Sequence, residues 1–146
     1  SARARGPIPG LIRPADGRLL STFGNRSGTR HEGVDIEPGP SGVVRAAANG
    51  KVAYAGFRRG YGLLAVIDHG GGLSTVYANL ETVLIAPGVE VRAGDPVARI
   101  APGAAGASAY LHFEVRRGGV AINPSAVMNF GSSAPARLVA SAAPGS

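Results

Sequence analysis

Glycine and proline interrupt this chain so often that few folds remain open to it. Of its 146 residues, 23 are Gly and 11 are Pro, and neither residue type suits the interior of a helix or a strand. We therefore expect many turns that join short elements. Because 45% of the residues are hydrophobic, such a chain can still bury a core, and its length suits a single domain.

The apolar residues alternate with polar ones, or form short runs, between clusters of Gly, Pro, Asn and Asp. This pattern is typical of strands. The predicted strands are Arg18–Phe23, Val34–Ile36, Val43–Ala47, Lys51–Gly56, Leu63–His69, Ser74–Leu80, Val83–Ile85, Pro96–Ile100 and Tyr110–Arg116. The three glycines 70–72 predict a hairpin between the fifth and sixth of these strands, with the fourth as a third partner. One helical turn is predicted at Ser125–Met128, after Asn123 and Pro124.

The composition predicts one domain at residues 15–130. Residues 1–14 contain three arginines and three prolines and are expected to form a linker arm. Residues 131–146 lack periodicity and are expected to be a flexible tail, and residues 101–109, made of Ala, Gly, Ser and Pro, a pliable loop. No apolar run approaches the roughly 20 residues that span a bilayer, and residues 1–10 lack the apolar core of a signal peptide. The chain is therefore either cytosolic or a piece that begins after its targeting segment.

The charge and the missing cysteines exclude several classes of function. Fifteen basic residues against nine acidic ones give a net charge of +6, which favours polyanions such as anionic cell-wall polymers. Few aromatic residues, no tryptophan and no nucleic-acid-binding motif argue against nucleic acid. Without cysteine there is no disulfide and no thiolate zinc site. Any metal must therefore bind to nitrogen and oxygen ligands.

Three histidines, His31, His69 and His112, restrict any histidine-based site. On a helix, His31 and Asp35 would share one face, which suits a common metal ion, but Gly33 and the Val-Asp-Ile run after it disfavour a helix. On a straight strand the two residues would lie roughly 13 Å apart. A shared site therefore requires a bend, which Gly33 permits.

The segment around His112 alternates cleanly between apolar and polar residues. Its apolar side chains are expected to face the core, so the opposite face carries Tyr110, His112 and Glu114. Glu114 is then expected to act as an ion-pair partner or as a residue that orients a metal ligand. A lone histidine on a strand is usually structural, and His69 is expected to be so.

A series of short motifs follows along the chain: H-x-x-x-D at residues 31–35, Gly50-Lys51-Val52, Gly60-Tyr61-Gly62, Tyr77-Ala78, Leu111-His112-Phe113-Glu114-Val115-Arg116, and Asn123-Pro124. In this order and at these spacings they resemble the LytM/lysostaphin-type zinc peptidases. The resemblance covers residues 18–128. It implies a mainly β, compact antiparallel domain with an open groove, of the duplicated-hybrid-motif type. Active members cut the peptide cross-links of bacterial peptidoglycan.

The resemblance also implies a set of zinc ligands. The family's ligands correspond to His31, Asp35 and His112, and all three are present, so one zinc ion per chain is expected. Two histidines, a carboxylate and a water form a sensible tetrahedral catalytic site.

The family's two catalytic histidines, by contrast, are replaced by Asn79 and Tyr110. Asparagine has no useful basicity and a tyrosine hydroxyl is almost fully protonated at neutral pH, so neither can act as the general base. Both can donate a hydrogen bond to an oxyanion, which leaves slow hydrolysis possible. Glu32 follows His31 as the base does in H-E-x-x-H proteases, but that geometry belongs to a helix.

Family members that lack catalytic residues, the EnvC-like and NlpD-like factors of cell division, bind and activate peptidoglycan amidases. Residues 51–63 resemble this subgroup in particular. The prediction is therefore a regulator of peptidoglycan hydrolases in the periplasm or another extracytoplasmic compartment, with peptidoglycan or an amidase as its partner. The residues expected to line the groove or to contact that partner are Arg58, Arg59, Tyr61, Asn79, Tyr110 and Glu114.

Two alternatives remain. The first is an active zinc endopeptidase with substituted auxiliary residues. The second is a biotinyl or lipoyl carrier, because the glycines and valines of residues 88–97 resemble the turn pattern of those small β domains. A carrier needs a lysine at an exposed hairpin tip, and the only lysine, Lys51, begins a strand.

Overall fold

The computed structural model describes residues 11–26, 29–101 and 109–130. The predicted tail, residues 1–10 of the predicted arm and most of the predicted loop at residues 101–109 lie outside this part of the chain. The elements are β1 (Leu19–Ser21), β2 (Gly24–Arg26), β3 (Thr29–His31), β4 (Val34–Ile36), β5 (Val43–Arg45), β6 (Gly50–Arg58), β7 (Gly62–Gly70), β8 (Leu73–Ala78), β9 (Thr82–Val83), β10 (Glu90–Val91), β11 (Pro96–Arg99), β12 (Leu111–Arg117), β13 (Val120–Ile122) and α1 (Pro124–Val127).

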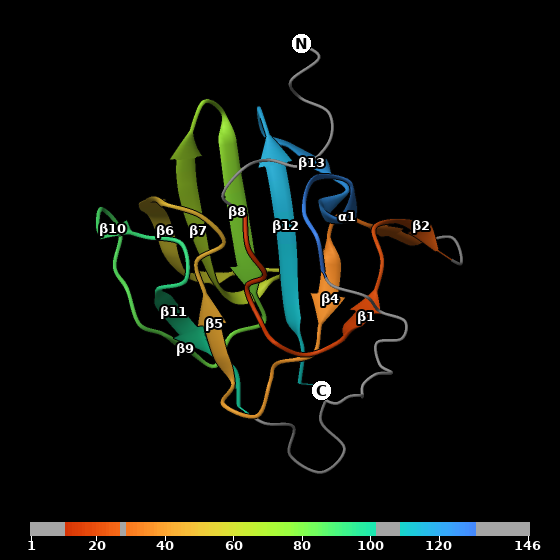
Figure 1. Cartoon of the computed structure of the whole chain (residues 1–146), viewed down its shortest axis with the longest axis horizontal. Coiled ribbons are helices and arrows are strands. Elements are labelled where there is room, and N and C mark those ends of the chain that lie inside the picture. Colours follow the sequence, from red (N-terminus) through yellow and green to blue (C-terminus); the bar gives the residue numbers. More distant parts are fainter. Residues whose placement is uncertain (1–10, 27–28, 102–108, 131–146) are drawn as a thin grey trace, which may run out of the picture.

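One large antiparallel sheet organises the fold. Its strands follow the order β1, β4, β12, β8, β7, β6 and β10, and β13 pairs with β12 (Figure 1). A smaller sheet has the order β5, β11, β9, and β2 pairs with β3 in a separate hairpin. The predicted class, a mainly β antiparallel domain, is therefore confirmed.

The hairpin predicted from the glycines 70–72 is present. β7 pairs with β8 and also with β6, both antiparallel, and all three glycines have positive φ, the conformation that glycine adopts at little cost. The predicted helical turn is also confirmed. It begins after Asn123, whose side-chain oxygen accepts a hydrogen bond from the Ser125 amide at 3.0 Å, as N-cap residues do.

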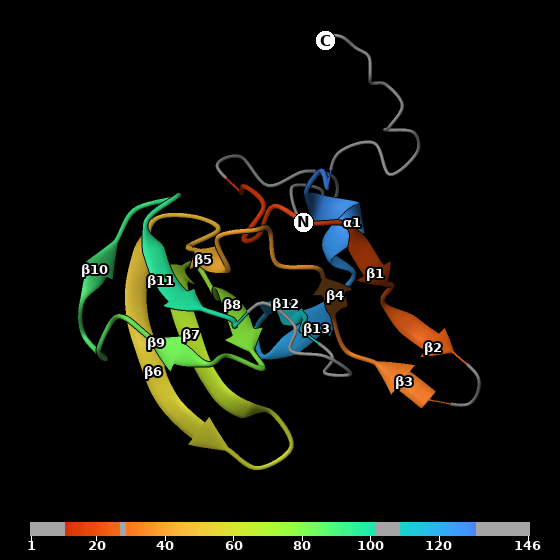
Figure 2. The same cartoon turned by 90° about the horizontal axis from the view of Figure 1, so that it is seen from below.

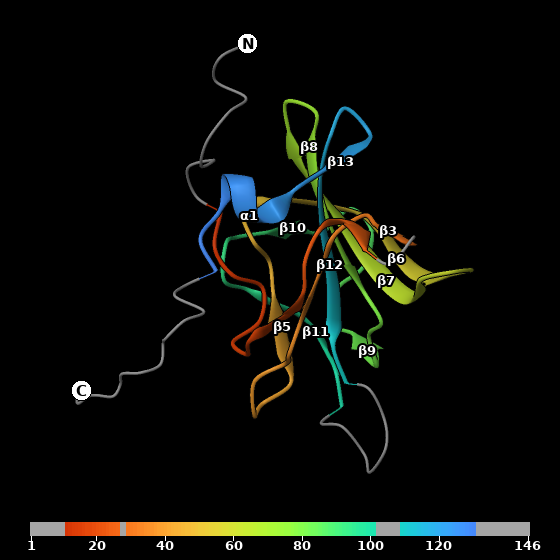
Figure 3. The ribbon, with the colours of Figure 1, turned by 90° about the vertical axis from the view of Figure 1, so that its right-hand side faces the viewer.

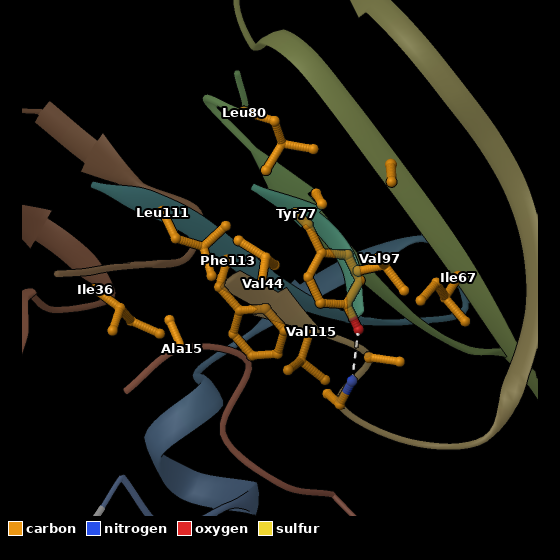
Figure 4. Packing of buried hydrophobic residues seen from close by; sticks show 14 of the residues in the cluster. Ala15, Ile36, Val44, Ile67, Tyr77, Leu80, Val97, Leu111, Phe113 and Val115 are labelled. Carbon is orange, nitrogen blue, oxygen red and sulfur yellow. Dashed lines mark hydrogen bonds between the residues drawn. The ribbon is translucent and has the colours of Figure 1, made fainter. Parts of the chain in front are cut away.

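The core fills the space between the large sheet and the smaller one. Apolar side chains that point to the same face of β7, β8 and β12 meet those of β5 and β11 in one buried cluster (Figure 4). Its largest members include Tyr77, Phe113, Ile36, Ile67 and Leu111. The opposite face of β12, β8 and β7 does not contribute to this cluster and is therefore available for a functional site.

The short arm segment that the structure describes is docked on this domain. The Ile12 amide donates to the Ala47 carbonyl, and the Arg45 amide donates to the Pro14 carbonyl, both at 2.8 Å. Leu11 packs against the core. Residues 11–14 therefore contact the domain, which the composition of the predicted arm did not indicate. Within the described residues, no helix has the length and apolar character needed to cross a membrane.

His69 belongs to a chain of hydrogen bonds that runs into the core. Its Nδ1 donates to the Asn49 carbonyl, and its Nε2 contacts Thr75 Oγ1, both at 2.7 Å. Thr75 Oγ1 contacts the Tyr77 hydroxyl, which accepts from the Ala47 amide (Figure 4). Because the Asn49 carbonyl can only accept, Nδ1 carries the proton and the neutral Nε2 accepts from Thr75. The expected structural role of His69 thus has a physical basis.

This arrangement predicts a pH-dependent stability. Burial is the main cause that lowers the pKa of His69 below its usual 6.5, so the folded chain binds fewer protons at His69 than the unfolded chain. The stabilisation is present above about pH 6.5 and is lost as the pH falls through the folded value. His69→Gln cannot titrate. We expect the gap in melting temperature between wild type and this variant to narrow from pH 7.5 to pH 5, whereas a constant gap would contradict this role.

Candidate functional site

A pocket opens on the face of the sheet that lies away from the core. Its volume is about 370 Å³, within the range of small-ligand sites. In Figure 2 the β2–β3 hairpin and the β6–β7 hairpin project on the same side of the domain, and in Figure 3 they lie on the side of β12 opposite α1 and β5. Segments far apart in the sequence meet in this pocket: His31, Asp35, Gly60, Tyr61, Gly62, Ala78, Asn79, Tyr110 and His112.

The bend expected at Gly33 is present and brings His31 to Asp35. β3 ends at His31 and β4 begins at Val34, and His31 Nε2 lies 3.6 Å from Asp35 Oδ2. A Cβ atom at Gly33 would lie 2.3 Å from the Phe113 carbonyl oxygen. Gly33 is therefore required by the close approach of β12 as well as by the bend.

The register of two neighbouring strands brings His112 to the same aspartate. His112 on β12 is directly opposite Asp35 on β4, and its Nδ1 lies 2.9 Å from Asp35 Oδ1. The two residues are 77 positions apart in the sequence. All three predicted ligand residues thus converge in one pocket through backbone pairing and one bend.

A backbone carbonyl group fixes the orientation of the His31 ring. Its Nδ1 lies 3.2 Å from the Thr22 carbonyl oxygen, which can only accept, so Nδ1 is the donor. In the neutral ring, Nε2 then carries the lone pair that faces Asp35. Nothing in the sequence pattern indicated this role for the Thr22 backbone.

Glu114 lies below the pocket and does not line it. Its side chain is 1% exposed, and its Oε2 lies 2.8 Å from His112 Nε2. The Tyr61 hydroxyl donates to the same oxygen at 3.0 Å, and Arg116 forms an ion pair with Oε1. Glu114 therefore forms the expected ion pair, but it does not line the pocket as predicted.

Burial and neighbouring charges shift the pKa values of His112, Glu114 and Tyr61. Burial opposes a charge on His112, but the hydrogen bonds to Asp35 and Glu114 outweigh it and raise the pKa of His112 to about 9. Burial likewise opposes a charge on Glu114, yet His112 and Arg116 lower the pKa of its carboxyl group. Burial and the neighbouring Glu114 raise the pKa of Tyr61. The ionised form of the buried Glu114 carboxylate is therefore favoured.

Asn79 and Tyr110 both line the pocket and contact each other. The Asn79 side-chain amide donates to the Tyr110 carbonyl at 2.8 Å, which occupies part of its hydrogen-bonding capacity. Asn79 has a φ of 68°, a left-handed conformation that asparagine and histidine tolerate better than most residues. Both residues line the pocket, as expected of the positions that the resemblance equates with the family's catalytic histidines.

The predicted arginines lie on the neighbouring β6–β7 turn, outside the lining of the pocket. Arg58 stacks over the Tyr54 ring, with its guanidinium carbon 4.7 Å from the ring centre, and Arg59 is exposed. The adjacent Phe57 is 72% exposed, a feature that the strand pattern did not single out. A basic and aromatic tip thus stands beside the pocket.

The pocket contains side chains that can bind a metal ion, but their spacing is not that of a metal centre. Among the described residues, no group of three or more His, Cys, Asp or Glu side chains has the arrangement of a metal centre. His112 is within hydrogen-bonding distance of Asp35, whereas the distance from His31 to Asp35 is longer.

The antiparallel sheet and the His, Asp and His side chains that share its pocket are those of a LytM-type domain. The chain belongs to peptidase family M23, whose family model matches residues 29–124.

Similar proteins include two that are named as murein hydrolase activators. The chain is 36% identical to the murein hydrolase activator NlpD of Salmonella dublin, over 85% of this chain and 33% of that protein. It is 34% identical to the murein hydrolase activator EnvC of Escherichia coli, over 76% of this chain and 27% of that protein. Among solved structures, Csd3 of Helicobacter pylori matches with a TM-score of 0.69 and 29% identity, over 84% of this chain and 34% of that one. The chain spans about a third of the length of these proteins.

Proposed function

We propose that this chain is a degenerate LytM-type domain that activates a peptidoglycan hydrolase, in particular an amidase, and does not itself cleave peptidoglycan efficiently. One observation carries the proposal: Asn79 and Tyr110 occupy the two pocket positions where active family members have histidines. The names of the two activator relatives support the regulatory role. We assign this role to residues 15–130, with residues 1–14 and 131–146 as flanking segments.

The chemistry of the pocket supports a weak hydrolase at most. The lining side chains that can accept a proton at neutral pH are His31, Asp35 and His112, and all three are the proposed metal ligands. Asn79 and Tyr110 can stabilise an oxyanion by donating hydrogen bonds, but neither can accept a proton from water at neutral pH. The loss of general-base catalysis typically lowers the rate by about 10²- to 10⁴-fold.

The donor set fits one zinc ion. Two imidazoles and one carboxylate are the ligands of many zinc sites, which leave a fourth position open. His31 Nε2 and His112 Nδ1 both face the Asp35 carboxylate, at 3.6 Å and 2.9 Å. We assign His31 Nε2, Asp35 and His112 Nδ1 as the ligands. These three residues would hold the ion, which would act there as a Lewis acid.

The same proposal places the chain outside the cytoplasm, in the periplasm or an equivalent envelope compartment, with a role in wall remodelling at cell division. Its partner is an amidase or peptidoglycan itself. Support comes from the net charge of +6, which attracts anionic wall polymers, and from the activator relatives.

Release of soluble fragments from dye-labelled peptidoglycan tests the proposal directly. The chain alone is expected to release little dye, an amidase alone a basal amount, and the two together clearly more. Strong release by the chain alone would instead favour the second candidate function, an active zinc endopeptidase. The observation that favours this alternative is that His31, Asp35 and His112 all line the pocket.

The basic tip offers a more specific test of the partner. Reversing its charge, in Arg58→Glu with Arg59→Glu, is expected to reduce amidase stimulation by tenfold or more at low salt and less at high salt, because complementary charge mainly accelerates association. The matched control is Arg92→Glu with Arg99→Glu, which changes the net charge equally at exposed positions outside the pocket. Equal losses in both variants would indicate a non-specific charge effect and contradict the role of the tip.

A further inference from the structure

The buried carboxylate of Glu114 has three side-chain partners, which is more than an ion pair with a single cation provides. Its side chain is 1% exposed, and a buried charge is costly unless it is paired and hydrogen-bonded. Here Oε2 receives hydrogen bonds from both Tyr61 and His112, while Oε1 contacts Arg116. The carboxylate is therefore fixed from three directions, which places it rigidly against one nitrogen of His112.

We infer that Glu114 is a positioning residue for His112, and that Tyr61 holds Glu114 in the position where it can act. This inference rests on the proposed metal site. An imidazole that donates its Nε2 hydrogen to Glu114 can present only Nδ1 to a metal. In this structure Nδ1 is the nitrogen that faces Asp35, at 2.9 Å. Glu114 thus selects the ring orientation and the tautomer that the proposed ligand set needs.

Tyr61 is well placed for this supporting role. Its amide donates to the Arg58 carbonyl at 2.9 Å, and its carbonyl accepts from the Asn79 amide at 3.3 Å. The flanking Gly60 and Gly62 both have positive φ, which lets the chain turn sharply on either side of the tyrosine. The ring centres of Tyr61 and His112 lie 6.0 Å apart. The β6–β7 turn is therefore connected to a proposed ligand through a single side chain.

Zinc affinity measured by competition with a chromogenic chelator tests this inference. Glu114→Gln keeps the shape of the side chain but removes its charge, and it is expected to weaken zinc binding by about 10- to 100-fold, as loss of such partners typically does. Tyr61→Phe removes only the hydroxyl and is expected to weaken binding by less. The double variant should be no weaker than Glu114→Gln alone, because Tyr61 acts through that carboxylate.

Tyr54→Phe is the matched control. It removes a hydroxyl from the same hairpin, one that donates to the Phe57 carbonyl at 2.8 Å and has no role in the proposed site. Its zinc affinity is expected to equal that of wild type. An equal loss in Tyr54→Phe and Tyr61→Phe would show that any weakening of the hairpin suffices, and would overturn the positioning role.

The tautomer of His112 gives a readout that a purely structural role would not change. In zinc-loaded wild type, ¹⁵N NMR is expected to show a hydrogen on Nε2 that exchanges slowly with water, and faster exchange in Glu114→Gln. Wild type that binds no zinc would contradict the metal site, and the positioning role with it. Wild type that binds zinc while Glu114→Gln keeps full affinity and slow exchange would overturn the positioning role alone.

Discussion

Replacing Asp35 with alanine is expected to abolish zinc binding at micromolar zinc. Asp35 is the residue on which the proposed ligand set converges, since His31 and His112 both face its carboxylate, at 3.6 Å and 2.9 Å. Its loss leaves two neutral ligands and no anionic one, which is a poor site for a divalent cation. The measurement is the zinc content of purified protein after dialysis, with one ion per chain expected for wild type.

Asp68→Ala is a suitable control for this change. Asp68 lies on β7, where its side chain accepts a hydrogen bond from the Gly70 amide, and it does not line the pocket. This variant should retain zinc. Retention of zinc by Asp35→Ala, or its absence from wild type, would contradict the ligand assignment.

Restoring both family histidines, in Asn79→His with Tyr110→His, is expected to raise peptidoglycan hydrolysis by about 10²- to 10⁴-fold, the usual contribution of general acid–base catalysis. Both positions already line the pocket beside the proposed ligands. The left-handed backbone at Asn79, with a φ of 68°, is one that histidine also tolerates. The measurement is dye release from labelled peptidoglycan by zinc-loaded protein without an amidase.

The same double substitution combined with Asp35→Ala is the control, because it carries the new histidines without the proposed metal site. It should be as slow as wild type. Hydrolysis that rises equally with and without Asp35 would show that the metal site does not contribute. No rise in either protein would mean that more than two residues separate this pocket from an active one.

The strands that the sequence predicts best are those with a buried face. β4, β7, β8 and β12 show alternation or apolar runs and are found within two residues of their predicted limits. Among the strands of two or three residues, the β2–β3 hairpin, β10 and β13 were not predicted. β13, for example, exists because it pairs with β12 after the turn at Gly118 and Gly119. Such pairing depends on tertiary context, which a local pattern does not contain.

The ligand residues of the candidate site were predicted, but their arrangement in space was not. The resemblance implied His31, Asp35 and His112 as a group, and they do meet. The sequence alone allowed only a possible bend at Gly33, because the register of β4 against β12 joins residues 77 positions apart. The burial of Glu114 was also missed, since period-two alternation assigns it to the outward face. Its carboxylate instead contacts Tyr61, His112 and Arg116, and the contact with Tyr61 depends on tertiary structure.

Asn79 and Tyr110 lie immediately beyond the strands β8 and β12, which end at Ala78 and begin at Leu111. Neither residue belongs to a ladder, whereas Asp35 and His112 are paired within one. In evolutionary terms, a lineage can replace both catalytic histidines without altering a backbone pairing in the sheet. On the proposed function, a change of role at these two positions therefore requires no new backbone pairing in the sheet.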